Sequence, residues 1–132
     1  GGRIVNDKTI NEVYDHTDSP YAPFEESLKV DFLIHSWFFK TEWLKYMFLT
    51  KPYTLYNGED IHLSISCQIH GGIDTYVPRQ PSSDRSLWGD TNIHLGSDEH
   101  ATWRKGNHGN IRGEIMKYWM EEHNWKPINY RN

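Results

Sequence analysis

One short stretch, CQIHGGIDTY at residues 67–76, brings an imidazole, two glycines and a carboxylate close together. Imidazole and carboxylate groups transfer protons, bind metals and orient polar ligands. The glycine pair removes side chains at the same point, which lets a ligand approach backbone N–H groups closely. A tight turn without a ligand is the alternative for the glycine pair. The favoured prediction is a pocket for a small polar or nucleotide-like ligand, lined by His70, Gly71, Gly72, Asp74, Thr75, Tyr76, His62 and His94.

A metal site is a second interpretation of the same residues. His70, Asp98 and His100 supply imidazole and carboxylate groups, which suit a divalent transition metal such as zinc, iron or manganese. A metal held there would support hydrolysis of a phosphoester. No HExxH or CxxC spacing accompanies these residues. A related mechanism, in which two His-x-Ser/Thr strands flank a phosphate, fits IHLSI at 61–65, but IHLGS at 93–97 has glycine in place of the hydroxyl.

The segment before the glycines, DIHLSISCQIH at 60–70, alternates apolar and polar residues. Alternation with a period of two predicts a half-buried strand with Ile61, Leu63 and Ile65 on the buried face. The other face is either an ordinary solvated face, as in many antiparallel sheets, or a functional one; Lys and Glu, the usual residues of a solvated surface, are absent from it. With a second predicted strand at 91–98, that polar face carries His62, Ser64, Ser66, Gln68, His70, His94 and Asp98.

The remaining elements predict the fold class. Residues 28–35 also alternate, and residues 41–53 predict an aromatic-rich strand or a helical turn. Asn-Gly at 57–58 predicts a turn because this pair readily adopts positive φ. A C-terminal helix beginning near Asn107 or Asn110 follows from the helical spacing of Ile111, Ile115, Tyr118 and Trp119. Strands followed by one long helix predict an α+β fold, a mainly antiparallel sheet with the C-terminal helix packed on one face.

Composition narrows the classes of partner. The 132 residues are predicted to form a single domain, with residues 1–27 as a loosely packed N-terminal arm. Only 36% of the residues are hydrophobic, but six Trp, eight Tyr and five Phe supply large side chains for a small core. A net charge of −4 without a basic cluster disfavours binding to a nucleic-acid polymer.

The lengths of the apolar runs predict the subcellular location, and the cysteine count bears on disulfides. No run approaches about 18 apolar residues and no leader is visible, so we expect a cytoplasmic protein without a membrane partner. The single cysteine, Cys67, allows no intrachain disulfide and is expected to be a small buried residue. The oligomeric state stays open, with a homo-oligomer as one option.

Three stretches and the terminal helix carry a resemblance to a protein group. YMFLTKPYTLY, IHGGIDTY and IHLGSDEHATW resemble stretches of small uncharacterised proteins encoded in tailed-phage and prophage genomes. In that group an aromatic strand and a Pro-containing loop precede a His-Gly-Gly-Leu-Thr-Tyr stretch and a Gly-Phe-Asp-x-x-His stretch. The matching positions are Pro52, Leu55, Tyr56, His70, Gly71, Gly72, Ile73, Thr75, Tyr76, Gly96, Asp98 and His100, with Asp74 inserted and Asp98 one residue closer to His100.

The resemblance implies a phage-type protein expressed in the cytoplasm of a bacterial host. Proteins of this kind commonly act in host takeover or counter-defence. The sequence therefore predicts a protein that binds a small polar or nucleotide-like ligand. A metal-dependent phosphoester hydrolase is the alternative, and the second alternative is a protein–protein inhibitor of a host factor, anchored by surface aromatics such as Trp37, Trp43 or Trp125.

Overall fold

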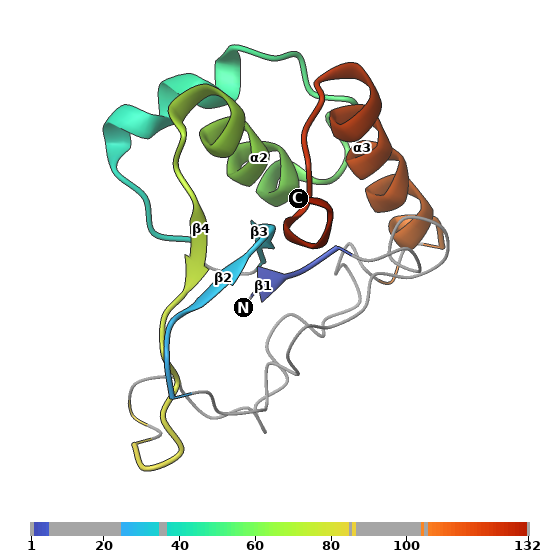
Figure 1. Ribbon diagram of the computed structural model, residues 1–132. Helices are drawn as coiled ribbons and strands as arrows, with labels where there is room; N and C mark the ends of the chain where they lie inside the picture. The colour runs from blue at the N-terminus through green and yellow to red at the C-terminus, as the bar shows by residue number, and fades with distance from the viewer. Residues whose placement is uncertain are drawn as a thin grey trace.

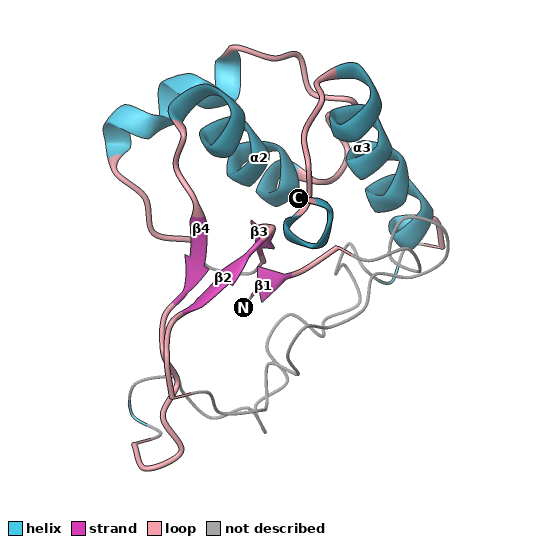
Figure 2. Cartoon of the chain, in the orientation of Figure 1, coloured by secondary structure: helices cyan, strands magenta, loops and turns pink. Residues whose placement is uncertain are grey.

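Two α-helices and two short antiparallel strand pairs form the described part of this computed structural model, which covers residues 2–5, 25–34, 37–84, 86, 104 and 106–131. Figure 1 shows the helices side by side above the strands, and Figure 2 separates helix, strand and loop. In chain order the elements are β1 (Gly2–Arg3), β2 (Leu28–Val30), β3 (Phe32–Leu33), the 3-10 helix η1 (Thr41–Phe48), α2 (Glu59–Gly71), β4 (Thr75–Val77), α3 (His108–Glu122) and the 3-10 helix η4 (Ile128–Tyr130). The predicted α+β class is confirmed.

The strands pair across long sequence separations. β1 pairs with β3, with Arg3 opposite Phe32, and β2 pairs with β4, with Lys29 opposite Tyr76. The predicted strand at 28–35 is therefore present as β2 and β3, and the helical alternative for 41–53 is found as η1. Residues 2–5 of the expected N-terminal arm belong to the packed structure, because Val5 is buried. Residues 6–24 and the predicted strand at 91–98 lie outside the described residues.

The prediction of a strand at 60–70 is wrong, because this segment is the helix α2. An alternating pattern also places apolar residues four apart, so Ile61 and Ile65 share one flank of a helix while Leu63 and Cys67 share another. Both flanks are covered, and every residue from 60 to 67 is buried. A helix that is buried all round needs no single apolar stripe. The period of the pattern therefore did not distinguish the two structures.

The glycine pair ends this helix. Gly72 adopts φ 61°, a left-handed conformation that glycine tolerates at a helix C-terminus. Its N–H donates to the Gln68 carbonyl at 3.2 Å, and the N–H of Ile73 donates to the Cys67 carbonyl at 3.1 Å. Gly58 starts the same helix at φ 82°, as expected for Asn-Gly. The pair thus stops α2 before β4, which places residues 73–76 beside the helix.

The core lies between α2, α3 and β3. α3 follows Asn107 as predicted and buries Ile115, Met116 and Trp119. These residues pack in one cluster with Val5, Phe32, Ile34, Ile61, Ile65 and Trp125. The C-terminal helix therefore packs on the strand side of the molecule as expected, but it shares that core with a second helix.

A buried carboxylate ties both ends of the chain to this core. Asp31 is fully buried between β2 and β3, and its carboxylate accepts hydrogen bonds from the backbone N–H groups of Val5 and Ile128, each at 2.8 Å. Burial raises the pKa of Asp31, while these hydrogen bonds act in the opposite direction. Among the described helices, none is long and apolar enough to cross a membrane.

Candidate binding site

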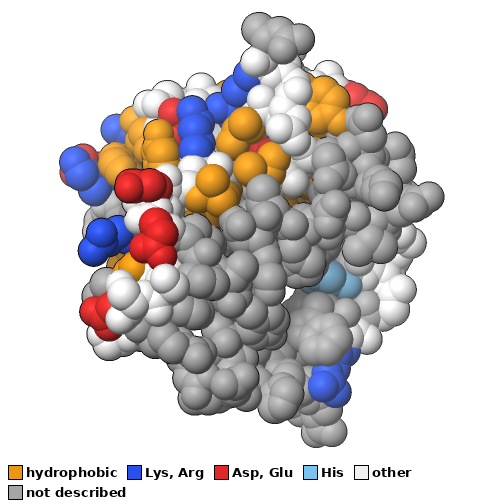
Figure 3. All heavy atoms as spheres, turned by 60° about the horizontal axis from the view of Figure 1, so that its bottom comes forward, with side chains coloured by type: hydrophobic (Ala, Val, Ile, Leu, Met, Phe, Trp, Pro, Cys, Tyr) orange, Lys and Arg blue, Asp and Glu red, His pale blue; other side chains and the backbone are white. Residues whose placement is uncertain are grey.

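Residues 37–56, called here the aromatic segment, expose large apolar side chains to solvent. Phe38, Leu55 and Tyr56 are 94%, 89% and 90% exposed. Five more large apolar side chains of the segment are also exposed: Phe39, Leu44, Phe48, Leu49 and Tyr53. Single exposed apolar residues are ordinary, but so many on one short segment make it a candidate interaction surface. Figure 3 turns the molecule so that the bottom of Figure 1 comes forward. On that face, hydrophobic side chains lie among charged ones.

The backbone of the aromatic segment is held against the helices. His62 Nε2 donates to the carbonyl of Met47 at 2.9 Å, and His70 Nε2 forms a 2.8 Å hydrogen bond with the Thr50 hydroxyl. The hydroxyl of Tyr118 donates to the carbonyl of Lys51 at 2.8 Å. The exposed rings therefore project from a backbone that α2 and α3 fix in place.

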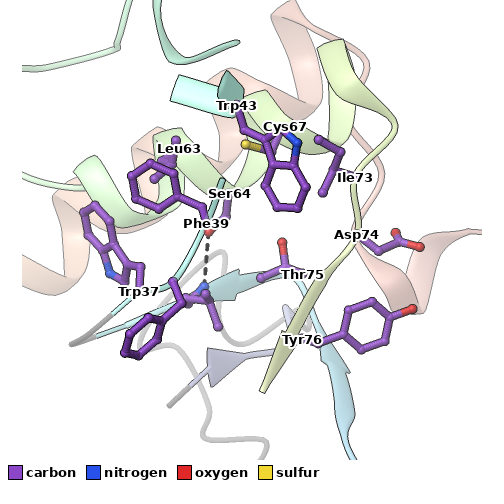
Figure 4. A pocket seen from close by; sticks show the side chains of 12 residues that line it. Trp37, Phe39, Trp43, Leu63, Ser64, Cys67, Ile73, Asp74, Thr75 and Tyr76 are labelled. Carbon is purple, nitrogen blue, oxygen red and sulfur yellow. Dashed lines mark hydrogen bonds between the residues drawn. The ribbon is translucent and has the colours of Figure 1, made fainter. Parts of the chain in front are cut away.

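A pocket lies between the aromatic segment and the start of β4. Its volume is about 250 Å³. In Figure 4 the side chains of Trp43, Ser64 and Thr75 surround the open space, whereas those of Asp74 and Tyr76 point away from it on the other side of β4. β3, the aromatic segment, α2 and β4 all contribute to the lining, which consists of Leu33, Trp37, Phe38, Phe39, Trp43, Leu63, Ser64, Cys67, Ile73, Asp74, Thr75 and Tyr76.

The pocket offers mainly aromatic and aliphatic surface. The hydroxyls of Ser64 and Thr75 already have partners: Ser64 Oγ accepts from the N–H of Leu33 at 3.2 Å, and Thr75 Oγ1 accepts from Gln68 Nε2 at 3.0 Å. Among the described residues, the buried Nε1 of Trp37 has no hydrogen-bond partner. Burial raises the pKa of the Cys67 thiol, which keeps it protonated and weakens it as a nucleophile. The arrangement suits binding of an apolar or flat group better than covalent chemistry.

The carboxylate of Asp74 is part of an ion-pair network. Asp74 Oδ2 lies 2.6 Å from Lys29 Nζ, and Asp74 Oδ1 lies 3.4 Å from Arg131 Nη1. All three side chains are about one-third exposed or slightly more. Surface pairs of this kind contribute little to stability, about 0–1 kcal/mol. Their main effect is to join β2, β4 and the C-terminal end.

The structure separates the residues that the sequence predicted for one ligand site. Asp74, Thr75 and Tyr76 line the pocket, whereas His62 and His70 hold the aromatic segment to α2. Gly71 packs against the Tyr46 ring, since an added Cβ would lie 2.7 Å from Cε2, and Gly72 caps the helix. The ring of His62 also lies 5.2 Å from that of Trp119, so its environment is the core.

The other predicted site residues, His94, Asp98 and His100, lie outside the described residues. Within the described ranges, no group of three or more His, Cys, Asp or Glu side chains is arranged to hold a metal ion. His70, the one described member of the predicted metal set, bonds to Thr50.

Of the three tryptophans proposed from the sequence as surface anchors, two lie at the pocket and one lies in the core. Trp37 and Trp43 line the pocket. The expectation for Trp125 is wrong, because this residue is buried in the core and its Nε1 donates to Gln68 Oε1 at 2.9 Å. The run SWFFKTEW at 36–43 held the signal for the pocket wall. This run and residues 73–76 line the same pocket only because residues 59–71 form a helix. The alternating pattern at 60–70 predicted a strand there instead.

Comparison with known proteins adds no further constraint. No protein-family model, curated protein or solved structure matches the chain. The resemblance to phage and prophage proteins therefore stays a prediction from the sequence stretches themselves.

Proposed function

We propose that this protein is a binding protein that docks onto another protein through the aromatic segment and the pocket behind it. The observation that carries the proposal is the series of exposed apolar side chains between Phe38 and Tyr56. Leaving them in water gives the isolated chain no stability, whereas burying them against a partner would be favourable. If the phage resemblance holds, the partner is a host factor and the protein is its inhibitor.

The pocket supports this function because a large side chain of the partner could bind in it. Binding energy in protein interfaces concentrates in a few aromatic or Arg side chains that fill well-packed pockets. Trp37 and Trp43 form part of the pocket wall, and the strongly exposed Phe38 belongs to both the pocket and the outer surface. A partner side chain seated among these rings would be surrounded by the other exposed residues of the segment, which would exclude water.

The double variant Phe48→Ser with Leu55→Ser tests this surface. Both side chains are exposed, at 77% and 89%, so the changes remove apolar contact area without opening the core. Ile69→Ser is a matched control, because Ile69 is an exposed apolar residue on α2 outside the aromatic segment. Affinity purification from native cells, followed by calorimetry with the purified partner, should give a stoichiometric complex that the double variant weakens at least about tenfold. A partner that binds the double variant and the wild type equally would exclude this surface.

A small ligand with a flat ring is a second candidate. The specific observation is that Trp37, Phe39 and Trp43 line one cavity, with the Thr75 hydroxyl beside them. Aromatic side chains bind flat rings, including nucleobases, by stacking, and nearby polar groups orient them. This candidate retains the nucleotide-like ligand that the sequence predicts, and it moves the site from the histidines to the rings.

Thiol labelling separates the two candidates. Cys67 is the sole cysteine of the chain and lines the pocket. A bound nucleoside or nucleotide should slow alkylation of Cys67 and raise the melting temperature, and Trp43→Ala should abolish both effects. If no member of a nucleoside and nucleotide panel slows the labelling, this small-ligand candidate is excluded for that class.

A further inference from the structure

The aromatic segment carries a charge opposite to that of the rest of the protein. Lys40, Lys45 and Lys51 stand against the single acidic residue Glu42, so residues 37–56 have a net charge of +2. The whole chain carries −4, which leaves −6 on the residues outside the segment. All three lysines are exposed. The segment with these exposed apolar side chains therefore also carries a local positive charge.

Two of these lysines lie over aromatic rings, whereas Lys29 and Lys117 lie beside carboxylates. Lys40 Nζ lies 5.6 Å from the ring centroid of Trp43, and Lys45 Nζ lies 5.0 Å from that of Tyr46. Lys29, in contrast, pairs with Asp74, and Lys117 pairs with Glu114 at 3.5 Å. In the described parts of the chain, no ion pair joins a lysine of the aromatic segment to a carboxylate. Among the described residues, no carboxylate therefore neutralises their charges.

We infer that the occupant of the aromatic segment is an acidic protein segment in which Asp or Glu residues alternate with large apolar side chains. This inference rests on the proposed function and names the chemistry of the partner. Apolar side chains of that segment cover Phe48 and Leu55 and fill the pocket, and its carboxylates approach Lys40, Lys45 and Lys51. Charges at the rim of an interface chiefly raise the association rate and exclude partners of the wrong sign.

The same charge pattern disfavours a symmetric pair of copies. A two-fold dimer through this surface would place each aromatic segment against its own copy. Two surfaces of net charge +2 would then face each other, and like charges brought together in an interface are unfavourable. A partner with complementary charge meets no such repulsion.

Selection from a library of displayed random peptides tests the inference without a known partner. Peptides are selected on the wild-type protein and measured against three variants. The first is Phe48→Ser with Leu55→Ser, and the second replaces Lys40, Lys45 and Lys51 by Ser. The control carries Ile69→Ser with Lys126→Ser, which removes one exposed apolar residue and one exposed lysine elsewhere. Circular dichroism and thermal melting confirm that each variant is folded.

The expected binders are enriched in both acidic and large apolar residues. Their affinity should fall at least about tenfold for the lysine variant and for the apolar variant, and remain unchanged for the control. Raising the salt concentration from about 50 mM to about 500 mM should weaken binding to the wild type but hardly affect binding to the lysine variant.

Four outcomes overturn the inference. Binders that need Phe48 and Leu55 but show no acidic excess contradict the partner chemistry and leave the docking surface standing. Binders that ignore both the apolar and the lysine changes contradict the docking surface itself. Lysine-dependent self-association in sedimentation velocity, or lysine-dependent binding to vesicles of anionic lipid with no acidic peptide selected, assigns the surface to another occupant.

Discussion

The partly buried side chain of Gln68 joins segments that are distant in the sequence. Gln68 Nε2 donates to the backbone carbonyl of Asp31 at 2.6 Å and to the Thr75 hydroxyl at 3.0 Å. Gln68 Oε1 accepts from Trp125 Nε1 at 2.9 Å and from Arg131 Nη2 at 2.8 Å. Both N–H donors and both acceptor positions of the amide are therefore used. A satisfied amide of this kind holds α2, β4 and the C-terminal end in one arrangement.

Protonation of His62 should make stability depend on pH. Burial lowers the pKa of His62 below its ordinary value of 6.5, and the nearby His123 and His70 act in the same direction. Below pH 6.5 the unfolded chain therefore binds a proton that the folded chain resists, so stability falls as the pH drops through this range. Urea unfolding at about pH 7.5 and about pH 5.5 should show this loss for the wild type and a smaller loss for His62→Gln.

The comparison isolates His62 because other groups titrate in both proteins. Burial also lowers the pKa of His108, and that contribution to the pH dependence is common to the wild type and the variant. Gln keeps a side-chain N–H that can donate to the Met47 carbonyl, so the variant removes mainly the titration. Equal losses in the two proteins would show that His62 has no part in the pH dependence.

The boundaries of α2 depend on two glycines in different surroundings. Gly58 and Gly72 both have positive φ, but a Cβ at Gly58 would meet Cδ1 of Ile115, whereas a Cβ at Gly72 would have no neighbour within 4 Å. Gly72→Ala should therefore cost only the backbone penalty of about 1–2 kcal/mol. Gly58→Ala should cost about 2–4 kcal/mol, because Ile115 must also move within the core. Chemical denaturation measures both, and equal costs would contradict the close approach of Gly58 to Ile115.

The N-terminal ends of α2 and α3 are joined by a buried ion pair. Arg112 Nη1 and Nη2 donate to the two carboxylate oxygens of Asp60 at 3.0 and 2.8 Å, and the side chains are only 5% and 10% exposed. Removing one partner of a buried pair costs about 3–5 kcal/mol, because the other charge stays buried. We expect that cost for Asp60→Leu in urea unfolding, and recovery of most of it in Asp60→Leu with Arg112→Met. A double variant as unstable as the single one would contradict this explanation.

For the protein as a whole, the surface proposed for binding should be separable from the core. Phe48→Ser with Leu55→Ser should change the free energy of unfolding by no more than about 0.5 kcal/mol for each exposed site. Trp119→Ala should cost about 3–5 kcal/mol, because Trp119 is fully buried between the helices. Thermal and urea unfolding measure both changes. A large loss in the surface variant would show that Phe48 and Leu55 serve the fold.

The sequence predicted the α+β class and the elements whose signals are local. Asn-Gly at 57–58 predicted a turn, and Gly58 indeed has positive φ. The helical spacing of Ile115 and Trp119 predicted the buried side of α3. The alternation at 60–70 failed because α2 is covered on several sides, so polar residues such as His62 and Ser66 are buried together with the apolar ones. A period indicates a structure only when one face stays in water.

The candidate site was less predictable, since its parts meet only after the chain has folded. The sequence shows the chemical type and charge of the side chains in both segments. Residues 37–56 carry aromatic rings and lysines, and Asp74, Thr75 and Tyr76 follow the glycines. Their meeting depends on α2 lying between them and ending at Gly72, a matter of long-range packing. His62 and His70 were predicted to contact a ligand, but in the folded protein they form hydrogen bonds with Met47 and Thr50 of the aromatic segment. Local patterns carry the chemistry of side chains, and burial decides which of those side chains reach a partner.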